Sequence, residues 1–95
     1  NDYPLRVFPV NGYLSLSNNA TSVFVETDIT VTHPSTIEGQ SFALLIIQDK
    51  VGHKVKLSDE FVILSGTIKE TPSTITLING ITIDGKIYCN LWNKI

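Results

Sequence analysis

Residues 41–48 read Ser-Phe-Ala-Leu-Leu-Ile-Ile-Gln, a stretch that is apolar at every position between its two polar ends. In a β-strand successive side chains point to opposite faces, so Phe42, Leu44 and Ile46 would share one face and the odd-numbered residues the other. A strand that is apolar on both faces must be covered on both. Two interpretations stay open: the second face meets another subunit, or loops of the same chain fold over a central strand.

The flanking sequence extends the β pattern. Ser22–His33 alternates apolar and polar residues, as expected for a strand with one buried face. Asn-Gly pairs at 11–12 and 79–80 predict two tight hairpins, between 6–10 and 13–17 and between 74–78 and 81–83. Ile, Val and Thr are abundant and Ala occurs only at positions 20 and 43, which disfavours helix. We therefore expect one all-β domain over 1–95, a small antiparallel β-sandwich or barrel of about seven to nine short strands with no substantial helix.

Composition excludes several classes of protein. Hydrophobic residues make up 42% and charged residues 17% of the 95 residues, which is typical of a globular domain. The net charge of −2 argues against nucleic-acid binding. The longest apolar run, Ala43–Ile47, is far shorter than the ~20 residues of a membrane-spanning helix. The chain begins with Asn-Asp-Tyr-Pro and contains no Met, so we expect a fragment or processed product of a longer protein.

Candidate catalytic groups are few. The single cysteine, Cys89, shares strand parity with Ile87 and Leu91 and should face the core as a small apolar residue. The histidines, His33 and His53, lie too far apart in sequence for a recognised zinc motif. We expect no enzyme activity, no cofactor and no metal.

Binding residues are easier to propose. Tyr88, Asn90 and Trp92 share the outer side of the last predicted strand, and two aromatic rings with an amide form a suitable platform for a sugar. Packing against a neighbouring strand or subunit is the alternative for these three residues. The turn from Asp49 to His53 brings a carboxylate and an imidazole within reach of one ligand, unless it is simply a solvated turn.

Three further residues are weaker candidates for contact with the saccharide. His33 ends the long predicted strand, just before a proline, and is expected to be a partly buried rim residue. Arg6 and Asp28 are secondary candidates for the same saccharide site. The predicted saccharide ligands are therefore Trp92, His53, Asp49, Tyr88, Asn90 and His33.

Several short motifs resemble a known family. Residues 39–49 form a Gly-Gln-Ser strand that ends in Gln-Asp, and Gly52, Thr71-Pro72-Ser73 and the strand from Asp84-Gly85 to Tyr88 follow in order. This pattern resembles the C-terminal receptor-binding heads of phage tail-fibre, tailspike and baseplate proteins, including those of lactococcal phages. The family's usual Trp-containing stretch is replaced here by residues 59–62, Asp-Glu-Phe-Val.

The resemblance implies that the chain is the C-terminal fragment of a longer fibrous protein. It would form a homotrimeric β-rich head at the distal tip of a tail fibre or baseplate in the virion. Such a head binds host cell-wall saccharide for adsorption and needs no nucleic acid or membrane partner. Two alternatives remain: a trimerisation or end-capping module without a ligand, and an accessory carbohydrate-binding module of a bacterial glycosidase or adhesin.

Overall fold

The computed structural model describes residues 5–17, 19–34 and 37–94, and within them the chain forms nine β-strands and no helix. The described residues thus contain no helix with the length and hydrophobicity needed to cross a bilayer. The predicted all-β class is confirmed. In chain order the strands are β1 (Leu5–Val7), β2 (Tyr13–Ser15), β3 (Ala20–Val25), β4 (Ile29–Thr32), β5 (Ser41–Gln48), β6 (Val55–Leu57), β7 (Phe61–Ser65), β8 (Ile75–Ile83) and β9 (Lys86–Lys94).

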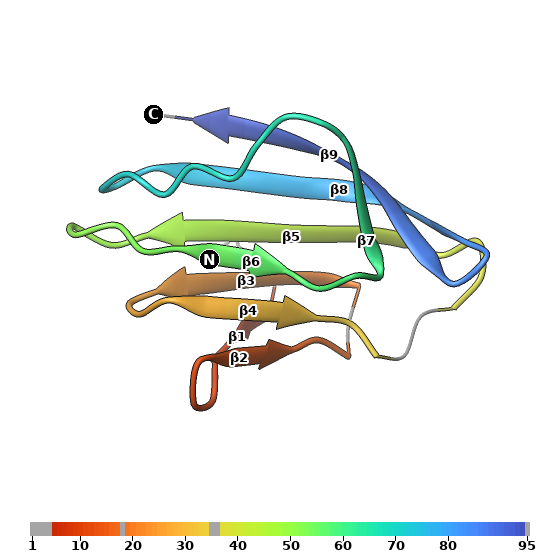
Figure 1. The fold of residues 1–95 in the computed structure, drawn as a ribbon, viewed down its shortest axis with the longest axis horizontal. Helices are drawn as coiled ribbons and strands as arrows, with labels where there is room; N and C mark the ends of the chain where they lie inside the picture. Colours follow the sequence, from red (N-terminus) through yellow and green to blue (C-terminus); the bar gives the residue numbers. More distant parts are fainter. Residues whose placement is uncertain (1–4, 18, 35–36, 95) are drawn as a thin grey trace.

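The strands form two sheets that pack face to face (Figure 1). The large sheet has the order β1-β3-β5-β8-β9-β7, and the small sheet has the order β2-β4-β6. From β1 to β6 the chain crosses from one sheet to the other after every strand. The architecture is therefore a two-layer β-sandwich in which sequence neighbours mostly lie in different layers.

This winding makes most of the strand pairs parallel, and the expectation of an antiparallel sandwich is wrong in this respect. β1, β3 and β5 run parallel in the large sheet, β2, β4 and β6 run parallel in the small sheet, and β7 runs parallel to β9. Only the β5–β8 and β8–β9 pairs are antiparallel. A chain that alternates between layers returns to each sheet in the same direction, whereas hairpin turns would have reversed it.

The long strand expected over Ser22–His33 is two strands in different sheets. β3 ends at Val25 and β4 begins at Ile29, with an exposed bend between them. The alternation of apolar residues continues across the bend because both strands direct their odd-numbered residues into the shared interior. The periodicity therefore predicted the buried residues correctly but not the break.

The two Asn-Gly pairs have different roles. At 11–12 both residues have positive φ, and the N–H and C=O groups of Val10 and Tyr13 exchange two hydrogen bonds of 2.8 and 2.9 Å, so the tight turn is confirmed. Its two arms then diverge into different sheets. At 79–80 the predicted turn is wrong because β8 runs straight through; a Cβ at Gly80 would collide with the backbone carbonyl of Tyr88. The real hairpin turn is Asp84-Gly85, between β8 and β9.

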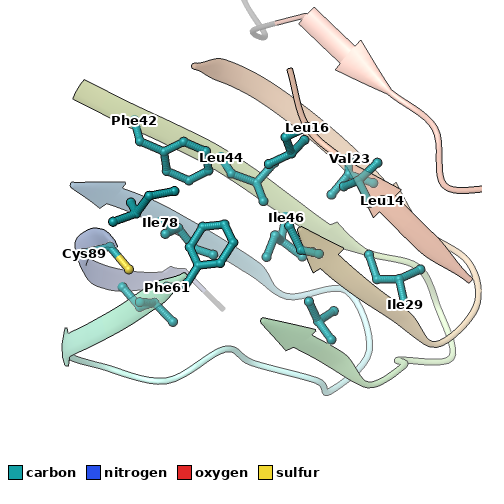
Figure 2. Close-up of a cluster of buried hydrophobic side chains, with 14 of the residues drawn as sticks. Leu14, Leu16, Val23, Ile29, Phe42, Leu44, Ile46, Phe61, Ile78 and Cys89 are labelled. Atoms are coloured by element: carbon teal, nitrogen blue, oxygen red, sulfur yellow. The ribbon is translucent and has the colours of Figure 1, made fainter. Parts of the chain in front are cut away.

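The core lies between the sheets (Figure 2). Leu14 and Ile29 from the small sheet meet Leu44, Ile46 and Ile78 from the large sheet. Of the two apolar faces of β5, the one formed by the even-numbered residues is thus buried in the core. The odd-numbered residues point outward and are only half-buried, so the outer face of the large sheet keeps apolar side chains in contact with solvent.

Candidate functional site

The outer face of β9 carries the predicted aromatic pair. Ile87, Cys89 and Leu91 are buried, and the alternating residues Tyr88 and Trp92 point to the opposite face. Burial also raises the pKa of the Cys89 thiol, which keeps it protonated. The predicted division of β9 into a core side and an outer side is confirmed.

Two side chains that the sequence did not single out complete this group. Nε1 of Trp92 donates a 2.9 Å hydrogen bond to Oδ1 of Asn79 on β8. Oγ of Ser65 on β7 donates a 2.7 Å hydrogen bond to Oδ1 of Asn90. Asn79 and Asn90 are paired across the β8–β9 ladder, so the five side chains come from three adjacent strands. We call this group the aromatic–amide cluster: Ser65, Asn79, Tyr88, Asn90 and Trp92.

The geometry leaves specific groups of the cluster open to solvent. Trp92 is 60% exposed although its indole N–H is held. Because both amide oxygens accept hydrogen bonds, the side-chain N–H groups of Asn79 and Asn90 remain as donors without a partner in the described part of the chain. An orienting hydrogen bond, an open ring face and two donors form a surface that can bind a hydroxylated ring.

The turn after β5 brings Asp49 and His53 together, as predicted. Nε2 of His53 lies 3.0 Å from Oδ2 of Asp49. The backbone amides of Gly52 and Val51 donate to Oδ1 of Asp49 over 3.0 and 2.9 Å. The pKa of Asp49 is lowered, chiefly by the Gly52 hydrogen bond, with further contributions from Val51 and His53 that outweigh partial desolvation. The carboxylate is therefore charged at neutral pH and rigidly oriented.

A second carboxylate approaches His53 from the other side. Oδ1 of Asp28 lies 3.9 Å from Nδ1 of His53 and accepts a 2.9 Å hydrogen bond from the backbone amide of Lys54. Asp28, a secondary candidate in the sequence, thus joins the turn. In the described part of the chain, no group of three or more His, Cys, Asp or Glu side chains has the arrangement of a metal site.

The surface beside this turn is apolar. A cavity of about 420 Å³ is lined by Phe24, Ile47, Gln48, Asp49, Lys50, Ser73 and Ile75. The guanidinium carbon of Arg6 lies 5.6 Å from the centre of the Phe24 ring. Arg6 therefore packs on an aromatic face at the edge of the large sheet and joins neither predicted ligand group.

His33 does not belong to any exposed group, and its assignment as a rim residue that contacts saccharide needs correction. It is 3% exposed, and its ring packs edge-on against Phe42 with centroids 5.4 Å apart. Neither ring nitrogen has a hydrogen-bond partner among the described residues. Its backbone amide donates a 2.6 Å hydrogen bond to Glu60. A ligand at the surface cannot reach this imidazole because the core surrounds it.

Fold and site together define a class: a small all-β domain that presents aromatic and amide side chains from a rigid sheet. A family model of phage tail fibre C-terminal domains matches residues 11–88, which is more than half of the chain. The chain belongs to this family of phage tail fibre C-terminal domains. No curated protein and no solved structure matches it.

The family membership confirms the tail-fibre part of the sequence resemblance and fits a location in the virion tail.

Proposed function

We propose that this domain is a receptor-binding head at the distal tip of a tail fibre, which adsorbs the phage to saccharide on the host surface without chemical catalysis. The observation that carries the proposal is the aromatic–amide cluster on the outer face of a tail-fibre domain. The fixed sheet supports the cluster, so little conformational entropy is lost when a ligand binds.

The chemistry of the cluster suits a neutral sugar ring. The C–H face of a pyranose would pack on the exposed indole of Trp92 or the ring of Tyr88. Sugar oxygens would accept hydrogen bonds from the free N–H groups of Asn79 and Asn90. One such site would bind weakly. Repetition of the site in a homotrimer and over several fibres would raise the overall avidity by several orders of magnitude.

A second candidate function rests on the same face. Leu45 and Ile47 on β5 are half-buried there. Their partners across the ladder, Leu77 and Ile75 on β8, are half-buried as well. Contiguous apolar surface of this kind is typical of a protein–protein contact. Under this alternative the outer face packs against other copies of the chain, Trp92 lies in that contact, and the domain is a trimerisation or end-capping module.

One variant separates the two functions. Trp92→Ala removes the ring, and Trp92→Phe is the matched control that keeps an aromatic face but loses the indole N–H. Binding of purified host-surface polysaccharide is measured by calorimetry, and the molecular mass by sedimentation velocity. Saccharide recognition predicts that Trp92→Ala abolishes binding at unchanged mass, whereas Trp92→Phe retains part of the affinity. If Trp92→Ala instead lowers the molecular mass while each folded chain binds polysaccharide as before, the cluster is not a saccharide site. That result would favour the trimerisation or end-capping module.

A further inference from the structure

The outer face of the small sheet carries a cavity with several charged lining residues, on the side of the molecule opposite the aromatic–amide cluster. The cavity measures about 390 Å³ and lies between the end of the β3–β4 bend and β6. Its lining combines two lysines, two carboxylates and one hydroxyl over a floor of two buried apolar residues: Asp28, Ile29, Thr30, Lys54, Val55, Lys56 and Glu70. We call it the lysine–carboxylate pocket.

The strand register places an aromatic ring beside this pocket. Thr30 on β4 is paired with Tyr13 on β2 and with Lys56 on β6, so the three residues form one row across the outer face. Tyr13 is 62% exposed. Since adjacent strands are about 4.8 Å apart, the Tyr13 ring borders the space above Thr30.

The carboxylates of the pocket are held in place by the backbone. Oδ1 of Asp28 accepts a 2.9 Å hydrogen bond from the amide of Lys54, and Oε2 of Glu70 accepts a 3.1 Å hydrogen bond from the amide of Val55. The second oxygen of each carboxylate accepts no hydrogen bond from the described residues. Each of these two oriented carboxylates therefore has a second oxygen that can accept a hydrogen bond from a ligand in the cavity.

The lysines are not neutralised by these acids. In the part of the chain that the structure describes, the ammonium groups of Lys54 and Lys56 form neither an ion pair within 4.0 Å nor a hydrogen bond. Two cations that line a cavity without internal partners are suited to an anionic group of a ligand.

We propose that the lysine–carboxylate pocket is a second saccharide site, which binds an acidic glycan bearing a carboxylate or phosphate. The anionic group lies between Lys54 and Lys56, sugar hydroxyls donate to Asp28 and Glu70, and the ring packs toward Tyr13. The inference rests on the proposed function and assigns it a charged ligand class. The outer face of the large sheet cannot bind saccharide while it packs against another subunit. The lysine–carboxylate pocket lies on the opposite side of the molecule, so it stays accessible in either case.

The test is a titration of the ¹⁵N-labelled chain followed by amide chemical shifts. The probes are an oligouronic acid, an oligo(glycerol phosphate) and neutral dextran, so the first two arms distinguish carboxylate from phosphate. The expected result is a shift of the amides of Thr30 and residues 54–56 with an acidic probe but not with dextran. The affinity should fall severalfold when salt is raised from about 0.1 to 0.5 M, because exposed charges are screened.

Paired variants control for net charge. Lys54→Gln/Lys56→Gln should lose about tenfold in affinity, equivalent to ~1.4 kcal/mol. Lys50→Gln/Lys86→Gln makes the same change of charge outside the pocket and should lose less than about twofold. Equal losses in the two double variants, or no shift of the pocket amides with either acidic probe, would overturn the inference.

The same spectra distinguish failure of the pocket from failure of the proposed function. If host polysaccharide shifts only Asn79, Asn90 and Trp92, the pocket is not a site and the domain is still a saccharide-binding head. If host polysaccharide shifts neither group and neither Trp92→Ala nor the Lys54/Lys56 double variant alters phage adsorption, both proposals are overturned.

Discussion

The indole nitrogen of Trp92 lies 2.9 Å from Oδ1 of Asn79, so a hydrogen bond between neighbouring strands fixes the most exposed aromatic ring of the aromatic–amide cluster. The Asn-Gly pair at 79–80 predicts a turn at Asn79. In the structure it lies within β8 and orients the tryptophan of β9.

Removing this acceptor should loosen the ring without unfolding the domain. For Asn79→Ala we expect lower fluorescence anisotropy of Trp92 and weaker binding of saccharide. The free energy of unfolding should change by less than about 1 kcal/mol because the bond is exposed. Trp92 is the only tryptophan, so the signal is specific. Asn79→Asp keeps an acceptor oxygen and serves as the control; equal anisotropy loss in both variants would contradict the role of this bond.

The outer face of β5 should control self-association. Leu45→Lys places a charge on the half-buried outer side. We expect it to dissociate any trimer at micromolar concentration while the monomer stays folded, as measured by sedimentation velocity and circular dichroism. Leu44→Ala, one residue away on the buried side, should instead lower the free energy of unfolding by about 2–5 kcal/mol. Unchanged association of Leu45→Lys would exclude this face as the contact.

His33 should be dispensable for both stability and binding. Its ring nitrogens are buried without a partner among the described residues, which is costly for a polar group. Its backbone hydrogen bond to Glu60 does not need the side chain. We expect His33→Leu to raise the free energy of unfolding by about 1 kcal/mol in urea titrations. Saccharide affinity should not change. A large loss of stability would instead reveal a partner for the imidazole.

Two glycines with similar backbone conformation should differ sharply in their tolerance of alanine. Gly39 and Gly52 have φ of 79° and 85°. A Cβ at Gly39 meets no atom of the described residues within 4 Å, whereas a Cβ at Gly52 would collide with the carbonyl oxygen of Glu70. Gly39→Ala should cost about 1–2 kcal/mol of backbone strain, and Gly52→Ala should cost clearly more. Thermal unfolding measures both; equal costs would show that the 49–53 turn can move away from Glu70.

Acid should destabilise the domain through Asp49. Its pKa is lower in the folded than in the unfolded chain, so its stabilising effect is complete above about pH 5 and is lost as the pH falls through about 4 and below. Glu60 acts in the same direction. Burial is the largest single influence and opposes its ionisation, but the hydrogen bond from the His33 amide, together with Ser58 and the backbone amide of Glu60, outweighs burial and lowers its pKa. Asp49→Asn should therefore show a shallower loss of stability between pH 5 and 3 in denaturant titrations at fixed pH. An unchanged slope would contradict this.

Sequence periodicity predicted which residues are buried better than it predicted how strands pair. Alternation identified the inward residues of β3, β4 and β9 because burial depends only on the local period of two. Pairing depends on which layer each strand joins. An Asn-Gly pair signals a reversal, but it does not reveal that the chain then enters the opposite sheet, as it does after Val10.

The candidate site was predictable where its residues are near in sequence. Asp49 and His53 share one turn, and Tyr88, Asn90 and Trp92 share one strand face. Ser65 and Asn79 join them only through strand pairing across β7, β8 and β9. Asn79 could have been found if β8 had been read as one strand, since its parity then matches that of the outer face. Nothing local to Tyr13 indicated that it would lie beside Thr30 and Lys56.

The direction of the strands also determines how the large sheet bears load. β1 and β9 run the same way, so the start of β1 and the end of β9 lie at opposite ends of the sheet. Tension applied between those two points acts along the strands and perpendicular to the interstrand hydrogen bonds. The bonds of each ladder are then sheared together rather than opened one after another. We expect a domain with this geometry to resist unfolding when it is pulled between those two points.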